Sequence, residues 1–327
     1  MIGGHNLPGW WASNFQGADM VEMNSNLRII PCVDSAKIGE LRRQELDLPR
    51  TIAAELGRSA VEAAREGYYY SKSGEQVDWS LAVQAACAAK ISIPPEAILP
   101  EHERVFRGET RVQIANETTL QAAQRLLEKG LLPLVLNFAN GIQPGGGFLS
   151  GSKAQEEVLC RSSALYLTLV DDPMYLHHRK RHRPDSTDWA IYSPDVPVFR
   201  KDDGTVLEHP WLLSFLTCAA PYAPSIGQPE SGDLLQKRIG RVLAIARAFG
   251  YSAVVLGAWG CGAFANDPYR TAVDFREELE TEFRGAFSEV VFAITDWSPE
   301  RRFFGPFREV FMPSVAEENT TNGNDSG

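Results

Sequence analysis

Apolar residues recur at helical spacing in the first third of the chain, after a start without clear periodicity. Residues 1–45 are rich in Gly, Asn and Trp and carry no repeating apolar pattern, so we expect them to be irregular. From residue 48 to 67, apolar positions fall on one stripe of a helix, which Gly67 is suited to end. A second helix is predicted over residues 79–90. The first hundred residues therefore predict an extension that is irregular and then helical.

From about residue 100 the pattern changes to short apolar runs that alternate with amphipathic stretches. This alternation predicts an α/β fold with a mostly parallel or mixed sheet that helices cover on both faces. We expect a three-layer α/β/α domain over residues 101–312, after an N-terminal extension (1–100) and before a polar, disordered tail (313–327). The predicted strands are 109–115, 134–138, 213–219, 253–257 and 290–295, and the predicted helices are 120–129, from about 155, 234–249 and 269–283.

The net charge of −10 argues against direct nucleic-acid binding, because proteins that follow a nucleic-acid backbone usually present a basic face. One segment departs from this balance, since residues 177–183 read HHRKRHR. A solvated loop, a contact for a polyanionic substrate or partner, and a nuclear-targeting patch are all compatible with that segment.

Other features limit the location and the chemistry. No run of 18 apolar residues occurs, so we expect no membrane-spanning helix, and the start lacks the pattern of a secretory signal. The five cysteines form neither a CxxC pair nor a disulfide framework, which favours an intracellular, cytoplasmic location, or a nuclear one in a eukaryote. The six histidines show no paired metal-ligand spacing, so we expect neither a metal nor a cofactor.

A glycine-rich loop follows the predicted strand 134–138. The chain passes through Asn140 into three consecutive glycines, Gly145–Gly147, and a helix is predicted to begin near Gln155. Glycines let the backbone approach a ligand closely, and their N–H groups can converge on an anion. A helix N-terminus adds positive potential at the same corner of the sheet. The segment predicts a pocket for a diphosphate or sugar phosphate, with a simple flexible turn as the alternative.

Two glutamates, Glu156 and Glu157, open the predicted helix. Carboxylates stabilise helix N-termini, which alone would explain the pair. Their position directly after the glycine loop favours a catalytic role instead. Because neighbouring residues on a helix point about 100° apart, the two carboxylates cannot share one task. One should transfer a proton, and the other should orient a sugar hydroxyl.

A second loop of the same kind follows the predicted strand 253–257. It reads LGAWGCGAFANDP over residues 256–268, with Gly257, Gly260 and Gly262 closely spaced. Phe264 follows these glycines, where it is suited to lie against a sugar or a base, or else to pack in the core. No histidine lies nearby in the sequence to activate Cys261, so we interpret it and Cys160 as packing residues.

With these two loops the chain resembles the bacterial- and fungal-type poly(ADP-ribose) glycohydrolases, which are built on a macrodomain. Their hallmark is a GGG followed after a short spacer by QEE, and here FLSGSKA separates Gly145–Gly147 from Gln155–Glu157. Further stretches similar to that family are VLNFANGIQPGGGF, SPDVPVFRKDDG, LTCAAPY and VLGAWGCGAFANDP. The likeness extends from about residue 45 to residue 292.

The resemblance implies a role for each matching residue. Glu157 would protonate the departing 2′-oxygen of the neighbouring ADP-ribose unit and then act as a base on water, while Glu156 would bind ribose hydroxyls. Asn140 would hydrogen-bond the terminal ribose, and an adenine contact at Glu117 is a further expectation. The other residues expected at the substrate are Gly145, Gly146 and Gly147 around the diphosphate and ribose, Gln155 of the motif, and Gly260, Gly262, Ala263 and Phe264 of the second phosphate loop.

The reaction that the resemblance implies is hydrolysis of the ribose–ribose bond of poly(ADP-ribose) on modified proteins, with ADP-ribose as the product. Two alternatives stay open: a hydrolase that removes single ADP-ribose units from protein or nucleic acid, and a macrodomain that binds ADP-ribose without cleaving it. The loop glycines serve all three functions, and only Gln155–Glu157 favours an enzyme. The sequence leaves open whether cleavage is terminal or internal.

Overall fold

The structure is a computed structural model that describes residues 26–101, 106 and 108–312. Its centre is an eight-stranded mixed sheet in the order β1-β5-β10-β9-β6-β8-β7-β4, and a separate hairpin pairs β2 with β3. In this order, neighbouring strands from β1 through β8 pair in parallel, and the last two pairs, β8–β7 and β7–β4, are antiparallel. The strands are β1 (Leu27–Val33), β2 (Tyr68–Tyr70), β3 (Gln76–Asp78), β4 (Ile91–Ile93), β5 (Thr110–Ala115), β6 (Pro133–Ala139), β7 (Ala190–Arg200), β8 (Val206–Ala219), β9 (Ala253–Leu256) and β10 (Glu289–Ala293).

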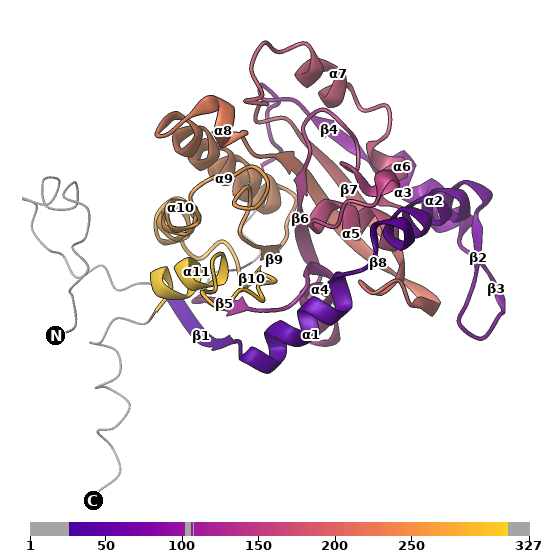
Figure 1. Ribbon diagram of the computed structural model, residues 1–327. Coiled ribbons are helices and arrows are strands. Elements are labelled where there is room, and N and C mark those ends of the chain that lie inside the picture. The colour runs from indigo at the N-terminus through magenta and orange to yellow at the C-terminus, as the bar shows by residue number, and fades with distance from the viewer. Residues whose placement is uncertain (1–25, 102–105, 107, 313–327) are drawn as a thin grey trace, which may run out of the picture.

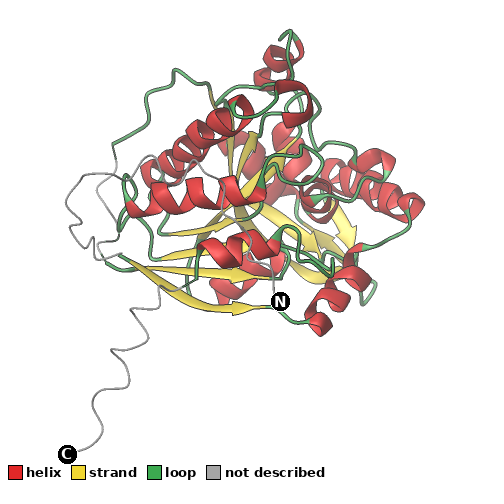
Figure 2. Cartoon of the chain, turned by 60° about the vertical axis from the view of Figure 1, so that its left-hand side comes forward, coloured by secondary structure: helices red, strands yellow, loops and turns green. Residues whose placement is uncertain are grey.

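Helices cover both faces of this sheet, as Figures 1 and 2 show, and the predicted three-layer α/β/α arrangement is confirmed. Helices α8 to α11 lie on one face, and α2 to α6 pack on the other. The helices are α1 (Ala36–Leu46), α2 (Arg50–Glu66), α3 (Ser80–Ala89), α4 (Thr119–Glu128), a 3₁₀ turn η1 (Phe148–Ser150), α5 (Gln155–Ser162), α6 (Leu165–Leu169), α7 (Pro173–Arg179), α8 (Ala223–Ile226), α9 (Glu230–Ala248), α10 (Pro268–Glu280) and α11 (Phe304–Val310).

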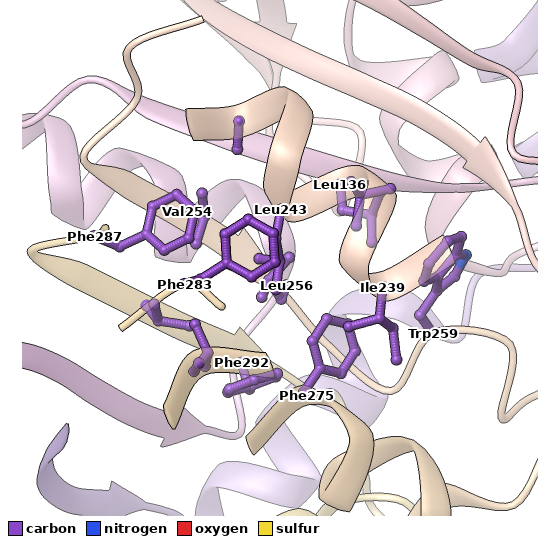
Figure 3. Packing of buried hydrophobic residues seen from close by; sticks show 14 of the residues in the cluster. Leu136, Ile239, Leu243, Val254, Leu256, Trp259, Phe275, Phe283, Phe287 and Phe292 are labelled. Atoms are coloured by element: carbon purple, nitrogen blue, oxygen red, sulfur yellow. The ribbon is translucent and has the colours of Figure 1, made fainter. Parts of the chain in front are cut away.

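The side chains of β6 point alternately to the two faces of the sheet, and both faces are buried. Leu134 and Leu136 join one apolar cluster, together with Leu243 of α9, and Figure 3 shows Leu136 and Leu243 in that cluster. Val135 points the other way, into a second cluster with Leu159 of α5. Successive strand residues face opposite sides of a sheet, so a fully apolar strand needs helices on both sides.

The periodic elements predicted from the sequence are confirmed within a few residues at each end, except for the start of the strand predicted at 213–219. The predicted helix over residues 48–67 is α2, and Gly67 ends it in the left-handed conformation (φ 81°). The strand and helix around the first glycine loop are β6 and α5. The segment 213–219 is the buried end of β8, which begins at Val206.

The prediction of an irregular structure up to residue 45 is wrong from residue 27 onward. β1 pairs in parallel with β5 at the edge of the sheet. Ser35 then caps α1 by accepting a hydrogen bond from the Ile38 N–H (3.1 Å). The expectations for residues 1–25 and for the tail from residue 313 lie outside the described residues. Within the described ranges, no helix is long and apolar enough to cross a membrane.

Candidate active site

A cavity of about 600 Å³ opens where the parallel strands end. Its walls come from the residues that follow four neighbouring strands: Glu117 after β5, Asn140 after β6, Gly260 after β9 and Trp297 after β10. The carboxyl ends of parallel strands meet at one edge of a sheet, which is where α/β folds collect ligands. The two glycine loops predicted from the sequence therefore face one cavity.

The first loop is held in shape by its own polar groups. The Asn140 side-chain oxygen accepts hydrogen bonds from the backbone N–H groups of Ile142 and Gln143, both at 3.0 Å. Gly145 and Gly146 then take positive φ angles of 69° and 57°, a region that favours glycine. Helix α5 begins after Ala154, which offers no side-chain cap. The loop thus delivers the first turn of α5 to the cavity.

The carboxyl groups of Glu156 and Glu157 each bind one backbone N–H of this loop. Glu156 Oε2 accepts from the N–H of Asn140 at 2.7 Å, and Glu157 Oε1 accepts from the N–H of Gly147 at 3.0 Å. The other oxygen of each carboxyl group is buried and has no hydrogen-bond partner in the described protein. Both side chains line the cavity. Each glutamate is therefore fixed to the loop by one oxygen, while its second oxygen is buried without a hydrogen-bond partner in the described protein.

Burial raises the pKa of the Glu156 carboxyl group well above its ordinary value. The N–H of Asn140 opposes this shift by binding the ionised form, and the neighbouring charge of Glu157 adds to it. Burial therefore favours the protonated form of Glu156. A neutral carboxyl group can donate as well as accept a hydrogen bond, and it does not repel a phosphate.

Gln155 fastens the start of α5 to the sheet. Its side-chain oxygen accepts a hydrogen bond from the N–H of Phe138 (2.9 Å). Its amide nitrogen donates to the carbonyl of Leu136 (2.8 Å) and to the Thr119 hydroxyl (3.2 Å). These bonds tie the helix that carries both glutamates to strand β6 and to the N-terminus of α4.

The second loop is stabilised from behind by Asn266. The Asn266 amide donates to the carbonyl oxygens of Pro221 (2.9 Å) and Gly260 (3.2 Å), and its oxygen accepts from the Ser231 hydroxyl (2.7 Å). A side chain at Gly262 would meet nothing within 4 Å, so this glycine leaves the space of the cavity open. Phe264 packs edge-on against Tyr222, with ring centroids 5.7 Å apart.

The structure brings together most of the residues predicted for the site. Gly145 and Gly146 are the exceptions, because both are buried behind the cavity wall instead of lining it. Glu117 lies in the wall, but both of its carboxylate oxygens bind Arg125, at 2.5 and 3.3 Å. The predicted residues that line the cavity are Glu117, Asn140, Gly147, Gln155, Glu156, Glu157, Gly260, Gly262, Ala263 and Phe264.

Comparison with known proteins agrees with this geometry. The family model described as "Microbial-type PARG, catalytic domain" matches residues 57–201. The crystal structure of the poly(ADP-ribose) glycohydrolase (PARG) from Thermomonospora curvata is 39% identical in sequence, with a TM-score of 0.75. The match covers 80% of this chain and 99% of that one. The chain belongs to the microbial-type poly(ADP-ribose) glycohydrolases.

Two further glycohydrolase structures are similar and hold ligands. The Thermomonospora curvata enzyme bound to the inhibitor ADP-HPD is 40% identical, with a TM-score of 0.74 over 79% of this chain and 99% of its own. The enzyme from Deinococcus radiodurans in complex with ADP-ribose is 39% identical, with a TM-score of 0.63 over 69% of this chain and 96% of its own. A search of the curated proteins finds no match.

Sequence reasoning missed an acidic residue in the wall of this glycohydrolase cavity. Asp202 follows β7, is buried, and accepts a hydrogen bond from the Thr118 hydroxyl (2.8 Å). Arg161 of α5 is also buried, and its guanidinium nitrogens have no hydrogen-bond partner in the described protein. Asp202 and Glu157 both favour the charged form of Arg161 against the effect of burial. A buried cation therefore lies within electrostatic reach of two acids of the site.

Asp202 should make the stability of the glycohydrolase depend on pH. Burial raises its pKa from the ordinary 3.8 to about 7. Between these values the folded state holds a proton that the unfolded state has lost, so stability falls as the pH rises towards 7. The shift corresponds to at most about 4 kcal/mol. Asp202→Asn should therefore raise the Tm at both pH values, and by more than twice as much at pH 8 as at pH 5, as measured by thermal unfolding.

The matched control for this prediction is Asp203→Asn, since Asp203 is the exposed neighbour in the same turn. It should shift the Tm by similar small amounts at both pH values. A Tm change for Asp202→Asn that is the same at pH 5 and pH 8 would contradict the assignment.

Proposed function

We propose that this glycohydrolase cleaves the ribose–ribose O-glycosidic bond of poly(ADP-ribose) and releases ADP-ribose, with Glu157 as the acid and base. The observation that carries the proposal is the paired arrangement of Glu156 and Glu157. Each carboxyl group is anchored by one oxygen to a loop N–H, each has a second oxygen that is buried and unpaired, and both residues line the cavity.

The proposed reaction uses one acid twice. Protonated Glu157 gives its proton to the departing 2′-oxygen as the bond to the anomeric carbon breaks, which leaves an oxocarbenium-like ribosyl group. Water then attacks the anomeric carbon and returns a proton to the Glu157 carboxylate. The products are ADP-ribose and a chain with a free 2′-hydroxyl. The N–H of Gly147 keeps the carboxyl group at one place throughout.

Glu156 and Asn140 are proposed to orient the ribose. The Glu156 carboxyl group, which the N–H of Asn140 holds through one oxygen, is proposed to hydrogen-bond one ribose hydroxyl. The Asn140 side-chain oxygen is engaged within its own turn, so its amide nitrogen is the group proposed to meet the sugar.

The second loop is proposed to hold the diphosphate. The backbone of Gly260, Gly262 and Ala263 lines the cavity opposite the first loop, and Phe264 is placed to lie against a ribose or the adenine. An adenine contact at Glu117 requires that the base approach a carboxylate that already binds Arg125.

The product analysis that tests the proposal uses an auto-modified ADP-ribose polymerase as the substrate. We expect ADP-ribose to be released from the polymer, and sizing of the products distinguishes terminal trimming, which yields ADP-ribose alone, from internal cuts, which yield short oligomers. A protein that carries single ADP-ribose units serves as the comparison. Release from the singly modified protein without shortening of the polymer would overturn the proposal in favour of the mono-ADP-ribosyl alternative.

We further propose an intracellular, reducing location for the enzyme. All five cysteines are free thiols in the structure, and Cys32 is exposed to solvent. Five free thiols, one of them exposed, are typical of a protein in a compartment where disulfides do not form.

A further inference from the structure

The basic segment His177–Arg183 spans the end of α7 and the turn that follows it. Three of its residues end the helix: His177, His178 and Arg179. Every residue of the segment except His178 is exposed. The helix lies at the top of Figure 1, where Met174 and Tyr175 on its first turn pack into the core while the segment at its end faces solvent. The segment therefore presents cations to solvent on a protein whose net charge is −10.

His178 joins this segment to the loop of the active site, so the interpretation as a solvated segment holds for the six exposed residues and not for His178. Burial lowers the pKa of His178 to about 4, which leaves the ring neutral. Its Nδ1 lies 2.9 Å from the carbonyl oxygen of Gly141, and because that oxygen can only accept, Nδ1 carries the proton. Nε2 then accepts from the N–H of Thr187 (3.1 Å). The ring acts as a neutral bridge and adds no charge.

Arg179 makes a second connection to the same loop. Its guanidinium donates to the carbonyl oxygen of Ile142 at 3.1 Å. Ile142 lies between Asn140 and Gln143, which both line the cavity. Arg179, the first exposed arginine of the segment, thus binds a residue whose neighbour in the chain, Gln143, lines the active site.

The segment retains an excess of positive charge after its ion pairs are counted. Arg181 binds Asp185 on its own turn, and the half-exposed Arg183 binds Glu230 of α9. Lys180 forms no ion pair with any residue in the described ranges. Ion pairs as exposed as Arg183–Glu230 are weak and can be exchanged for a stronger anionic partner.

We propose that the basic segment His177–Arg183 binds the pyrophosphates of the polymer that lie beyond the unit in the cavity. This rests on the proposed function, because it requires a polymeric substrate. Every unit of poly(ADP-ribose) carries a pyrophosphate, so a chain that leaves the cavity past the Asn140–Gln143 loop would bring negative charge to Arg179 and Lys180. Such a surface increases the capture of long substrates without contacting the bond that is cut.

The test compares a charge-reversed enzyme with a matched control. The first variant, Lys180→Glu/Arg183→Glu, reverses two charges of the segment. The control, Lys72→Glu/Lys129→Glu, makes the same change in net charge at two exposed lysines outside it. One of these lies in the β2–β3 turn and the other at the C-terminal end of α4. For long polymer at low salt, the segment variant should raise KM about fivefold or more and leave kcat unchanged. For a dimer of ADP-ribose, with one scissile bond, KM should stay within about twofold.

A direct binding measurement keeps this test independent of turnover. Fluorescently labelled long polymer is titrated into each variant, with labelled single-stranded DNA of matched charge as a second probe. We expect the segment variant alone to lose polymer affinity about fivefold and to show a weaker dependence on salt. Equal affinities and equal KM values for the segment variant and the control would overturn the proposal. A loss of DNA affinity without a loss of polymer affinity would also overturn it.

Discussion

Replacing Glu157 with glutamine should reduce the release of ADP-ribose from the polymer by about a hundredfold or more, while the affinity for ADP-ribose stays within about tenfold. Glutamine has nearly the shape of the glutamate and can still accept from the N–H of Gly147 through its oxygen, but it cannot transfer a proton. Initial rates on auto-modified polymerase and calorimetric titration with ADP-ribose measure the two effects separately. More than a tenth of the wild-type rate would show that Glu157 is not the acid.

The matched control for that variant is Glu156→Gln, which changes the neighbouring residue in the same way. Burial raises the pKa of Glu156 and so favours its neutral form, which makes a neutral amide a closer replacement there than at a residue that transfers protons. Its rate should exceed that of Glu157→Gln by at least about tenfold. The reverse order of the two rates would assign the proton transfer to Glu156.

Gly146→Ala should reduce kcat by about a hundredfold, because the new methyl group displaces the carboxyl groups. A Cβ atom at this position would lie 2.5 Å from Glu157 Oε1 and 3.0 Å from Glu156 Oε2. The backbone also has a φ of 57°, where a side chain adds about 1–2 kcal/mol of strain. Steady-state rates would measure the loss of kcat, and thermal unfolding would measure the loss of stability from the strain.

Gly130→Ala separates the strain from the displacement. Gly130 has a φ of 77°, and a Cβ atom there would meet nothing within 4 Å. It lies beyond the end of α4, away from the cavity. This control should lose a similar amount of stability and retain wild-type activity. If Gly146→Ala also retained full activity, the tight contact of the loop with the two carboxyl groups would not matter for catalysis.

The site was predictable where chemistry follows a strong local pattern. A buried strand, three glycines and a helix that begins with Gln155 placed β6, the first loop and α5 correctly, because each of these depends on neighbours in the sequence. Asp202 and Arg161 were not predictable in this way. Asp202 enters the wall because the turn after β7, which pairs with β8, lies beside Thr118, a residue 84 positions away in the sequence.

Five strands of the described structure were not predicted, and in two of them, β1 and β7, prolines interrupt the pattern. β7 reads AIYSPDVPVFR, and its register with β8 shifts between Ser193 and Val196, so it shows neither a continuous apolar run nor an alternating one. β1 contains Pro31 and is mostly exposed towards its end. Exposed and interrupted strands lack the period that makes buried strands such as β6 easy to recognise.

The two outermost strands of the sheet bear on how separate copies of the chain behave towards each other. An open sheet edge invites another strand to pair with it, which is a common start of aggregation. Here one border is β4, with only three residues, and the other is β1, where Pro31 cannot donate and the register shifts between Ile30 and Val33. Neither edge strand is well suited to pair with a strand of another copy. Both belong to the first hundred residues, which thereby cover the longer strands β5 and β7 and prevent them from pairing between copies.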